Sequence, residues 1–194
     1  MKRWTQAVLG VSLAVSVVAC AGDNANDANT AARDSGAAVG TAGANADRDF
    51  IQDQLEDGQA EVNLGKIASE RATHPQVKDF AQMMVREHQM AGEELRQAAS
   101  AANVQLNAAA EPDNDHKDAE EELSKLTGGE FDRKYIDKMI DEHQEAVNEL
   151  EKKQDAENVQ VRQWATKTLP KVRQHLEQAR QIQQTLEQAG NNPR

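Results

Sequence analysis

Two stretches of the chain are nearly alike: residues 78–95 read KDFAQMMVREHQMAGEEL, and residues 133–150 read RKYIDKMIDEHQEAVNEL. Their apolar residues recur every three or four positions, which is the period of an α-helix with one buried face. Each copy places a histidine, His88 or His143, on that apolar face. Because a buried polar ring needs a partner, these two histidines indicate a polar cluster inside a helical core.

The rest of the folded region has the same helical character. Residues 51–68 and 161–186 also repeat their apolar positions every three or four residues, without the alternation typical of β-strands. Breaks between the helices are marked by Pro75, by the Gly-Gly pair at 128–129 and by the polar residues 155–158. Proline is favoured at the first position of a helix, where its missing N–H is not needed. The sequence therefore predicts an all-α, ferritin-like four-helix bundle built from two antiparallel hairpins.

The connection between the second and third helices is long. Residues 103–129 contain Pro112 and a short predicted helix at 118–126. This connection either carries the chain along the bundle as a crossover or forms a cap over one end. Pro170, inside the fourth helix, removes one backbone hydrogen bond and should bend the helix, either as a tolerated kink or as a bend that aims His175.

The N-terminal residues 1–19 have the features of a secretory signal peptide. Basic Lys2 and Arg3 precede an apolar run that is too short to cross a bilayer. Cys20 is the only cysteine, so it cannot form an internal disulfide, and it stands where a bacterial lipobox has its lipidated cysteine. We expect a periplasm-facing lipoprotein of the bacterial cell envelope, anchored to the membrane through Cys20. Ala21 rather than aspartate follows Cys20, which favours the outer membrane in lipoproteins resembling this one.

Composition divides the remaining chain into three parts. Residues 20–46 are rich in Ala, Gly, Asn and Asp, and we predict a lipidated cysteine followed by a disordered tether. Residues 47–189 are predicted to form the bundle domain, and residues 190–194 a disordered tail. The formal net charge is −11, and removal of Lys2 and Arg3 with the signal peptide makes it two units more negative. Such a domain repels nucleic acid, so nucleic-acid binding is not expected.

The rise of an α-helix places one polar side chain from each helix at about the same level. These side chains are Glu61, His88, His143 and His175. Three imidazoles and a carboxylate suit a single divalent metal ion such as Fe, Zn or Mn. Met84 and Met139 precede two of the histidines by one turn and would suit copper, but methionine at such positions usually fills the core, so copper is less favoured. His74 and His116 are not expected to be ligands.

A di-iron centre is disfavoured, because Val85 and Ile140 stand where the Glu-x-x-His pair of di-iron bundles has glutamate. Glu87 and Glu142 point about 100° away from the histidines that follow them. We predict that they surround the metal site without bridging it, together with Tyr135. The alternative is that the buried histidines and Glu61 satisfy one another by hydrogen bonds and hold no metal.

The strings VKDFAQMMVREHQMAGEEL, FDRKYIDKMIDEHQEAV and LPKVRQHLEQA resemble those of the bacterial family named domain of unknown function 4142. The resemblance covers about residues 48–188 and implies a ferritin-like four-helix bundle in secreted or envelope-anchored proteins. The positions that match the family's motifs are Glu61, His88, His143 and His175, with Asp132, Tyr135 and Pro170 beside them. The resemblance implies no particular reaction.

Two main functions follow from the sequence. The first is an envelope protein that binds one divalent metal ion in the bundle core, for metal buffering or a stress response. The second is a structural or interaction module whose histidines form only a polar core, with self-association through helix faces such as residues 174–188. No Ser-His-Asp, Cys-His or phosphate-loop arrangement is present, so a non-enzymatic role is favoured. A redox or hydrolytic enzyme with an open metal position is a weaker third hypothesis.

Overall fold

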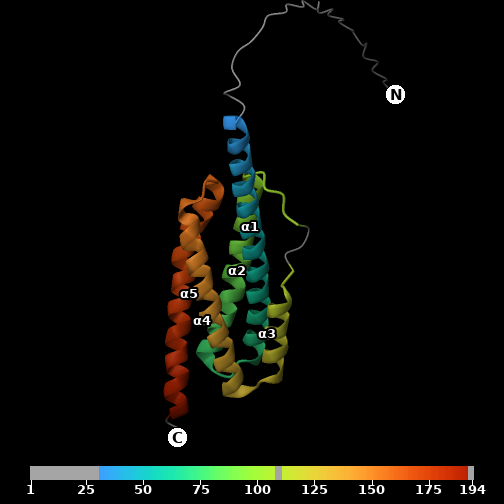
Figure 1. The fold of residues 1–194 in the computed structure, drawn as a ribbon. Helices are drawn as coiled ribbons and strands as arrows, with labels where there is room; N and C mark the ends of the chain where they lie inside the picture. Colours follow the sequence, from blue (N-terminus) through green and yellow to red (C-terminus); the bar gives the residue numbers. More distant parts are fainter. Residues whose placement is uncertain (1–30, 108–110, 192–194) are drawn as a thin grey trace, which may run out of the picture.

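The computed structural model describes residues 31–107 and 111–191, with side chains from residues 43–107 and 111–189. Within these ranges every regular element is a helix (Figure 1). In chain order the elements are α1 (Ala31–Arg71), α2 (Pro75–Ala101), α3 (Asn114–Lys125), α4 (Gly128–Lys152), a 3-10 turn (Lys153–Asp155) and α5 (Val159–Asn191). The hairpins α1–α2 and α4–α5 pack together as a four-helix bundle, and α3 lies against α1 and α4. The predicted all-α bundle is confirmed.

The helix boundaries lie at the proline, glycine and polar residues that the sequence predicts as breaks between helices. Helix α1 ends at Arg71 and α2 begins with Pro75 in its first turn. Helix α4 begins at Gly128, whose φ of 58° is a backbone conformation that favours glycine. Helix α5 begins after Asn158, whose side chain accepts hydrogen bonds from the first backbone N–H groups of the helix. It then continues through Pro170, which faces solvent, without interruption.

Helix α1 begins at Ala31, inside the segment that we predicted to be a tether. The side chains of residues 43–46 are partly or fully exposed, whereas Asp47 and Phe50 are buried. The packed core therefore starts close to the predicted boundary, but the helical backbone starts earlier. Alanine has the highest intrinsic helix propensity, so an Ala-rich extension can continue a packed helix without a core of its own. At the other end, α5 continues to Asn191, into the predicted tail.

The predicted signal peptide and Cys20 lie outside the described residues. Among the helices that the structure does describe, none combines the length and the apolar character needed to span a bilayer. The predicted lipid anchor at Cys20 stays an expectation from the sequence.

The connection between α2 and α4 is a crossover. Near the end of α2, Ala99 packs in the same apolar cluster as Phe50 and Leu150. At the start of α4, Phe131 packs with Leu64 in a second cluster at the opposite end of the bundle. The chain from α2 to α4, including α3, therefore returns along the bundle, as Figure 1 shows. Helices α2 and α4 run parallel, and the ferritin-like connectivity is the one that forms.

Two apolar clusters fill the bundle on either side of a polar layer. The turn cluster, near the α1–α2 turn, includes Leu64, Phe80, Met84, Phe131, Met139 and Ile182. The opposite cluster includes Phe50, Leu55, Leu95, Leu150, Val161 and Leu176. Both clusters take side chains from all four long helices, and His88 and His143 lie between them along α2 and α4. The apolar packing thus encloses the polar layer from both ends.

The turn between α1 and α2 is held by a side chain from α4. Asp132 is 1% exposed and accepts hydrogen bonds from the backbone N–H groups of Thr73 (3.0 Å) and His74 (2.8 Å). It also accepts a hydrogen bond from the Thr73 hydroxyl at 2.6 Å. His74 occupies the N-cap position of α2 but makes no side-chain cap. Asp132 therefore supplies the cap from another helix and joins the two hairpins.

We expect Asp132→Ala to lower the free energy of unfolding by about 2–3 kcal/mol, because it leaves the backbone donors of Thr73 and His74 without an acceptor. Asp132→Asn keeps one carbonyl oxygen and should lose less. Urea denaturation followed by circular dichroism measures the difference. Asp141→Ala, at an exposed position of the same helix, is the control and should change stability little. Equal losses in the Asp132 and Asp141 variants would show that the cap contributes nothing.

Gly65 lies where the backbone of α1 closely approaches α2. A Cβ atom at this position would lie 2.9 Å from Cγ2 of Val85 and 3.2 Å from the carbonyl oxygen of Ala81. At Gly92 of α2 a Cβ atom would meet only ordinary contacts, at 3.5 Å and beyond. The first position therefore requires glycine for packing, whereas the second does not.

Gly65→Ala and Gly92→Ala are expected to change stability in opposite directions. Alanine at position 92 should raise the free energy of unfolding by up to about 1 kcal/mol, through helix propensity. Alanine at position 65 should lower it by about 1–3 kcal/mol, because it forces the two helices apart. Paired thermal and urea denaturation of the two variants measures both effects. Stabilisation by both substitutions would contradict the close packing at Gly65.

Candidate metal centre

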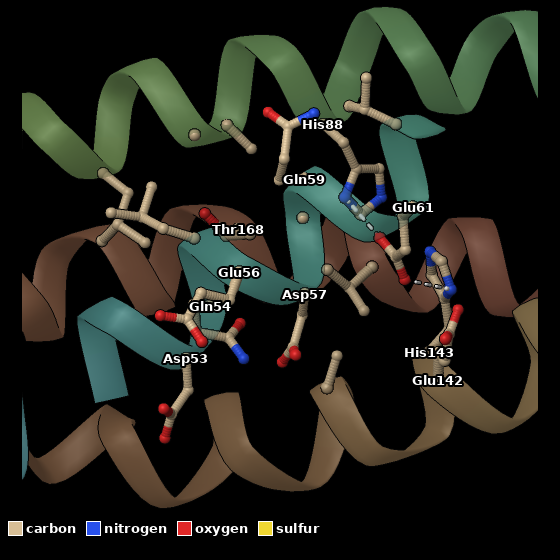
Figure 2. A pocket seen from close by; sticks show the side chains of 18 of the residues that line it. Asp53, Gln54, Glu56, Asp57, Gln59, Glu61, His88, Glu142, His143 and Thr168 are labelled. Carbon is tan, nitrogen blue, oxygen red and sulfur yellow. Dashed lines mark ion pairs between the residues drawn. The ribbon is translucent and has the colours of Figure 1, made fainter. Parts of the chain in front are cut away.

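Glu61 of α1 contacts two imidazoles from other helices in the middle of the bundle (Figure 2). Its Oε2 atom lies 2.6 Å from Nδ1 of His88 on α2, and its Oε1 atom lies 3.4 Å from Nδ1 of His143 on α4. The Glu61 side chain is 6% exposed. Gly58, almost one turn earlier, leaves room for the first contact, since a Cβ atom there would lie 3.9 Å from Nδ1 of His88. A buried carboxylate requires such partners, so this arrangement fixes Glu61 in the core.

His175 of α5 completes a cluster of three imidazoles, which we call the histidine triad. Its ring centroid lies 5.7 Å from that of His88 and 5.4 Å from that of His143. The rings of His88 and His143 are 5.5 Å apart. One nitrogen from each ring lies within 4.8 Å of the other two. The four side chains that the sequence predicted to meet at one level therefore do meet, one from each long helix.

Each ring of the triad uses one nitrogen for a contact within the protein. Nδ1 of His143 donates a hydrogen bond to the Met139 carbonyl oxygen (2.8 Å), and Nε2 of His175 lies 3.0 Å from Oε2 of Glu87. His88 uses Nδ1 for its contact with the Glu61 carboxylate. The second nitrogen of each ring is buried without a hydrogen-bond partner: Nε2 of His88, Nε2 of His143 and Nδ1 of His175. The triad thus offers one unpartnered nitrogen from each helix.

The electrostatics of the layer favour an ionised Glu61, and they act in opposite directions on the imidazoles: the pKa of His88 is raised, whereas those of His143 and His175 are lowered. Burial acts to raise the pKa of Glu61, but the charges of His88 and His143 outweigh it and lower this pKa to about 2. Burial lowers the pKa of His143 to about 4 and also lowers the pKa of His175. For His88, burial acts to lower the pKa, but the Glu61 charge outweighs it and the pKa is raised. Since metal ions bind the neutral imidazole, His143 and His175 are ready to act as ligands at neutral pH.

The three residues predicted to surround the ligands differ in their contacts. Glu87 contacts His175 directly, as described above. Glu142 instead contacts Lys138, whose Nζ atom lies 3.1 Å from Oε1, and burial and the charge of Glu61 raise the pKa of Glu142 to about 8. Tyr135 is fully buried, and its hydroxyl has no hydrogen-bond partner. Within the described residues, only Glu87 of the three contacts the triad.

A cleft of about 650 Å³ opens beside the triad, and acidic side chains far outnumber basic ones along it. The carboxylates lining it include Asp53, Glu56, Asp57, Glu61, Glu87, Asp113, Asp115, Glu142, Glu145 and Glu149. Figure 2 shows Asp53 and Asp57 projecting from the same side of α1, and Glu61 between His88 and His143. Only Arg96, Lys138 and Lys171 oppose them with fixed positive charge. Such a surface attracts cations towards the triad.

His116, which was not expected to be a ligand, also lies in this region. Its Nε2 atom lies 3.8 Å from Asp57 and 3.7 Å from Glu142, and it lines the cleft. The pairing of His116 with Asp113 three residues earlier is a local signal that could be read from the helix. Its position against α1 and α4 could not be read, because it depends on the path of the crossover.

The fold and the cluster together define an all-α bundle with a buried layer of three histidines and one glutamate. The chain matches the family described as "Domain of unknown function (DUF4142)" over residues 32–182 and belongs to that family. The predicted family is confirmed. None of the curated proteins compared with the chain matches it.

Solved structures of one other protein share this fold. They are described as CopM in the Cu(II)-bound form (TM-score 0.61, 21% identity), in the Cu(I)-bound form (0.58, 22%) and in the Ag-bound form obtained by co-crystallization (0.58, 23%). Each likeness covers 72% of this chain and 96% of the CopM chain. At this level of identity the likeness establishes the fold of the bundle.

Asp57, in the cleft, should make the stability of the metal-free protein depend on pH. Burial raises its pKa to about 7, and the charge of Glu61 adds to this effect. A carboxyl whose folded-state pKa is raised loses its contribution to stability as the pH rises through that value. Asp57→Asn removes the ionisation. The two proteins should be equally stable near pH 4, and the variant should be more stable by about 1 kcal/mol at pH 8, a small difference because solvent screens a half-exposed group.

Urea denaturation in the presence of a chelator, between pH 4 and pH 8, measures this difference. Asp118→Asn, at an exposed position of α3 outside the cleft, is the matched control and should show a nearly constant difference from the native chain. A stability difference for Asp57→Asn that stays constant or shrinks as the pH rises would contradict the raised pKa.

Proposed function

We propose that the protein binds a single copper ion at the histidine triad and acts as a copper-binding or copper-buffering protein. The observation that carries this proposal is the set of three buried imidazole nitrogens, one per ring, without hydrogen-bond partners. An unsatisfied buried polar group costs about 1–3 kcal/mol. A metal ion bound to these nitrogens would satisfy them, and the three rings already lie with their centroids 5.4–5.7 Å apart.

The charge of the polar layer supports monovalent copper. Metal binding requires all three imidazoles to be neutral, so His88, whose pKa is raised by the Glu61 charge, must release its proton when the ion binds. Glu61, whose pKa is lowered to about 2, then remains ionised beside three neutral rings. The nearby Glu142, with its pKa raised to about 8, is largely neutral at pH 7. A monovalent ion therefore balances the buried charge, whereas a divalent ion leaves one positive charge in excess in a poorly solvated interior. Imidazole nitrogens are suitable ligands for copper.

The likeness to CopM supports the same metal. The sequence favoured Fe, Zn or Mn over copper, because methionines near the histidines usually serve only as core packing. The solved structures that share this fold are described as Cu(I)-, Cu(II)- and Ag-bound forms. Together with the charge balance, this likeness leads us to place copper first. Met84 and Met139 remain in the fully buried turn cluster one turn from the triad, which agrees with a packing role.

Two carboxylates are proposed to orient the ligands. Glu61 was predicted as a fourth ligand, but in this structure it contacts the Nδ1 sides of His88 and His143. Glu87 contacts His175 in the same manner. A carboxylate that accepts a hydrogen bond from a ligating imidazole fixes its tautomer and raises its affinity for metal. We therefore assign Glu61 and Glu87 as positioning residues for the triad.

The alternative function is a structural module in which the histidines form only a polar core. One hydrogen-bonded nitrogen on each ring is compatible with that function. The unpartnered second nitrogens oppose it, because a purely structural cluster would be expected to satisfy them.

The location of the protein is also a proposal: the signal segment and Cys20 support a periplasm-facing lipoprotein of the envelope, with the outer membrane favoured.

The untagged mature protein is expected to bind one Cu(I) ion per chain in anaerobic competition with a chromophoric chelator. His143→Ala should weaken Cu(I) binding at least about 100-fold, because it removes a ligand. Glu61→Gln should weaken it about 10–100-fold, because it removes the charged carboxylate that orients His88 and lies beside His143. The melting temperature of the native chain should rise with Cu(I), since any ligand of the folded state stabilises it.

His74→Ala is the matched control, because His74 lies at the α1–α2 turn and contributes no atom to the triad. It should leave Cu(I) binding unchanged. A native chain that retains no copper, with a melting temperature that does not respond to Cu(I), would favour the structural module instead.

A further inference from the structure

A second group of ligand-type side chains lies in the cleft, and it includes a histidine from the crossover. Helix α3 carries His116 to a position where its Nε2 atom lies 3.8 Å from Oδ1 of Asp57 on α1. The same atom lies 3.7 Å from Oε1 of Glu142 on α4. The His116 side chain is 14% exposed and that of Glu142 is 12% exposed. Helices α1, α3 and α4 therefore each bring one of these side chains to the same part of the cleft, although within the described residues only the triad has ligand atoms that all lie within 4.8 Å of one another.

The hydrogen bonds of His116 show which nitrogen faces this point. Its Nδ1 atom lies 2.8 Å from Oδ1 of Asp113, and the same oxygen accepts the backbone N–H of His116 at 2.9 Å. An ionised carboxylate can only accept hydrogen bonds, so Nδ1 carries the proton in this contact. In the neutral ring, Nε2 then presents a lone pair towards Asp57 and Glu142. This is the orientation that a carboxylate gives to a metal-ligating histidine.

The space between these groups is not closed by direct hydrogen bonds. Distances of 3.7 and 3.8 Å from Nε2 to the two carboxylate oxygens exceed hydrogen-bonding distance. Lys138 lies 3.1 Å from Oε1 of Glu142 and is the positive group that competes for this carboxylate. The other oxygen of Glu142, Oε2, is buried without a hydrogen-bond partner. A cation bound to Nε2 of His116 would lie close to both carboxylates, and the Asp57 side chain would have to move towards it to complete the contact.

We propose that His116, Asp57 and Glu142 form a second cation site, which takes a divalent ion such as Zn²⁺. One imidazole nitrogen and two carboxylate oxygens are a suitable donor set for zinc. Tetrahedral bonds of about 2.1 Å place neighbouring ligand atoms about 3.4 Å apart, slightly closer than the separations between Nε2 and the two oxygens here. The Asp57 side chain is 48% exposed, so it has room to move inwards. Asp113 is the positioning residue of this site.

This site differs from the triad in its donors and in its ion. The triad offers three nitrogens beside one buried charge, whereas the second site offers two carboxylates and one nitrogen at the edge of the cleft. Harder oxygen donors favour Zn²⁺ over Cu(I). The two proposed sites share the cleft, and Glu142 precedes His143 in the chain, so the sites are neighbours. The second site does not depend on whether the triad binds copper.

The test is a Zn²⁺ titration by calorimetry of the full mature chain in two forms: preloaded with Cu(I), and as the His143→Ala/His175→Ala variant, in which the triad is dismantled. We expect one Zn²⁺ per chain in both forms. His116→Gln and Asp57→Asn should each weaken Zn²⁺ binding at least tenfold. Asp118→Asn, an exposed charge on α3 outside the cleft, is the control and should have no effect. Lys138→Gln should strengthen Zn²⁺ binding, because it frees Oε1 of Glu142.

Zinc binding that is absent in both forms, or that is unchanged by His116→Gln, would overturn the proposal. A third outcome would also overturn it: His116→Gln could lower the melting temperature in the presence of a chelator and still bind Zn²⁺ as well as the native chain. His116 would then only hold α3 against the bundle. If the other variants fold poorly, the Lys138→Gln variant still tests the proposal. If His116 only holds α3 against the bundle, this substitution should give no gain in zinc affinity. Failure of Cu(I) loading is measured separately and concerns the triad alone.

Discussion

The burial of one carboxylate determines how the four long helices meet. Glu61 lies between two apolar clusters, where an isolated charge would be strongly unfavourable. Its two oxygens contact His88 from its own hairpin and His143 from the other. The same demand for partners brings the hairpins into one register, and it leaves the opposite nitrogens of the rings facing the interior. The site and the alignment of the bundle are therefore consequences of a single interaction.

The crossover has a second consequence for the chemistry of the molecule. An up-and-down connection would have left α2 and α4 antiparallel and would have needed only a short loop. The longer path brings α3 against α1 and α4 and places His116 at the edge of the cleft. It also allows Asp132, at the start of α4, to cap the turn between α1 and α2. A connection that was ambiguous in the sequence thus contributes both to stability and to a proposed binding site.

Much of the site could be predicted because helices have a fixed rise and period. Counting residues from the turns placed Glu61, His88, His143 and His175 at one level, and the structure brings them together. The same counting could not show which nitrogen each ring uses, because that depends on side-chain rotamers and on local acceptors such as the Met139 carbonyl oxygen. It also could not place the side chains of the crossover, since spacing along the chain does not fix the path of a long connection. The early start of α1 was missed because composition alone does not show that a packed helix can extend beyond its core.

The repeated sequence of α2 and α4 corresponds to an approximate symmetry of the bundle. These two helices run parallel on one diagonal of the bundle, and α1 and α5 run parallel on the other. Rotation by half a turn about the long axis would exchange His88 with His143 and would superimpose Glu61 on His175. The polar layer therefore has approximate twofold symmetry that one residue breaks, because the Glu61 carboxylate of α1 stands opposite the His175 imidazole of α5. The electric field at a bound ion would therefore be directional and not symmetric. The negative charge that produces it lies on the α1 side of the bundle.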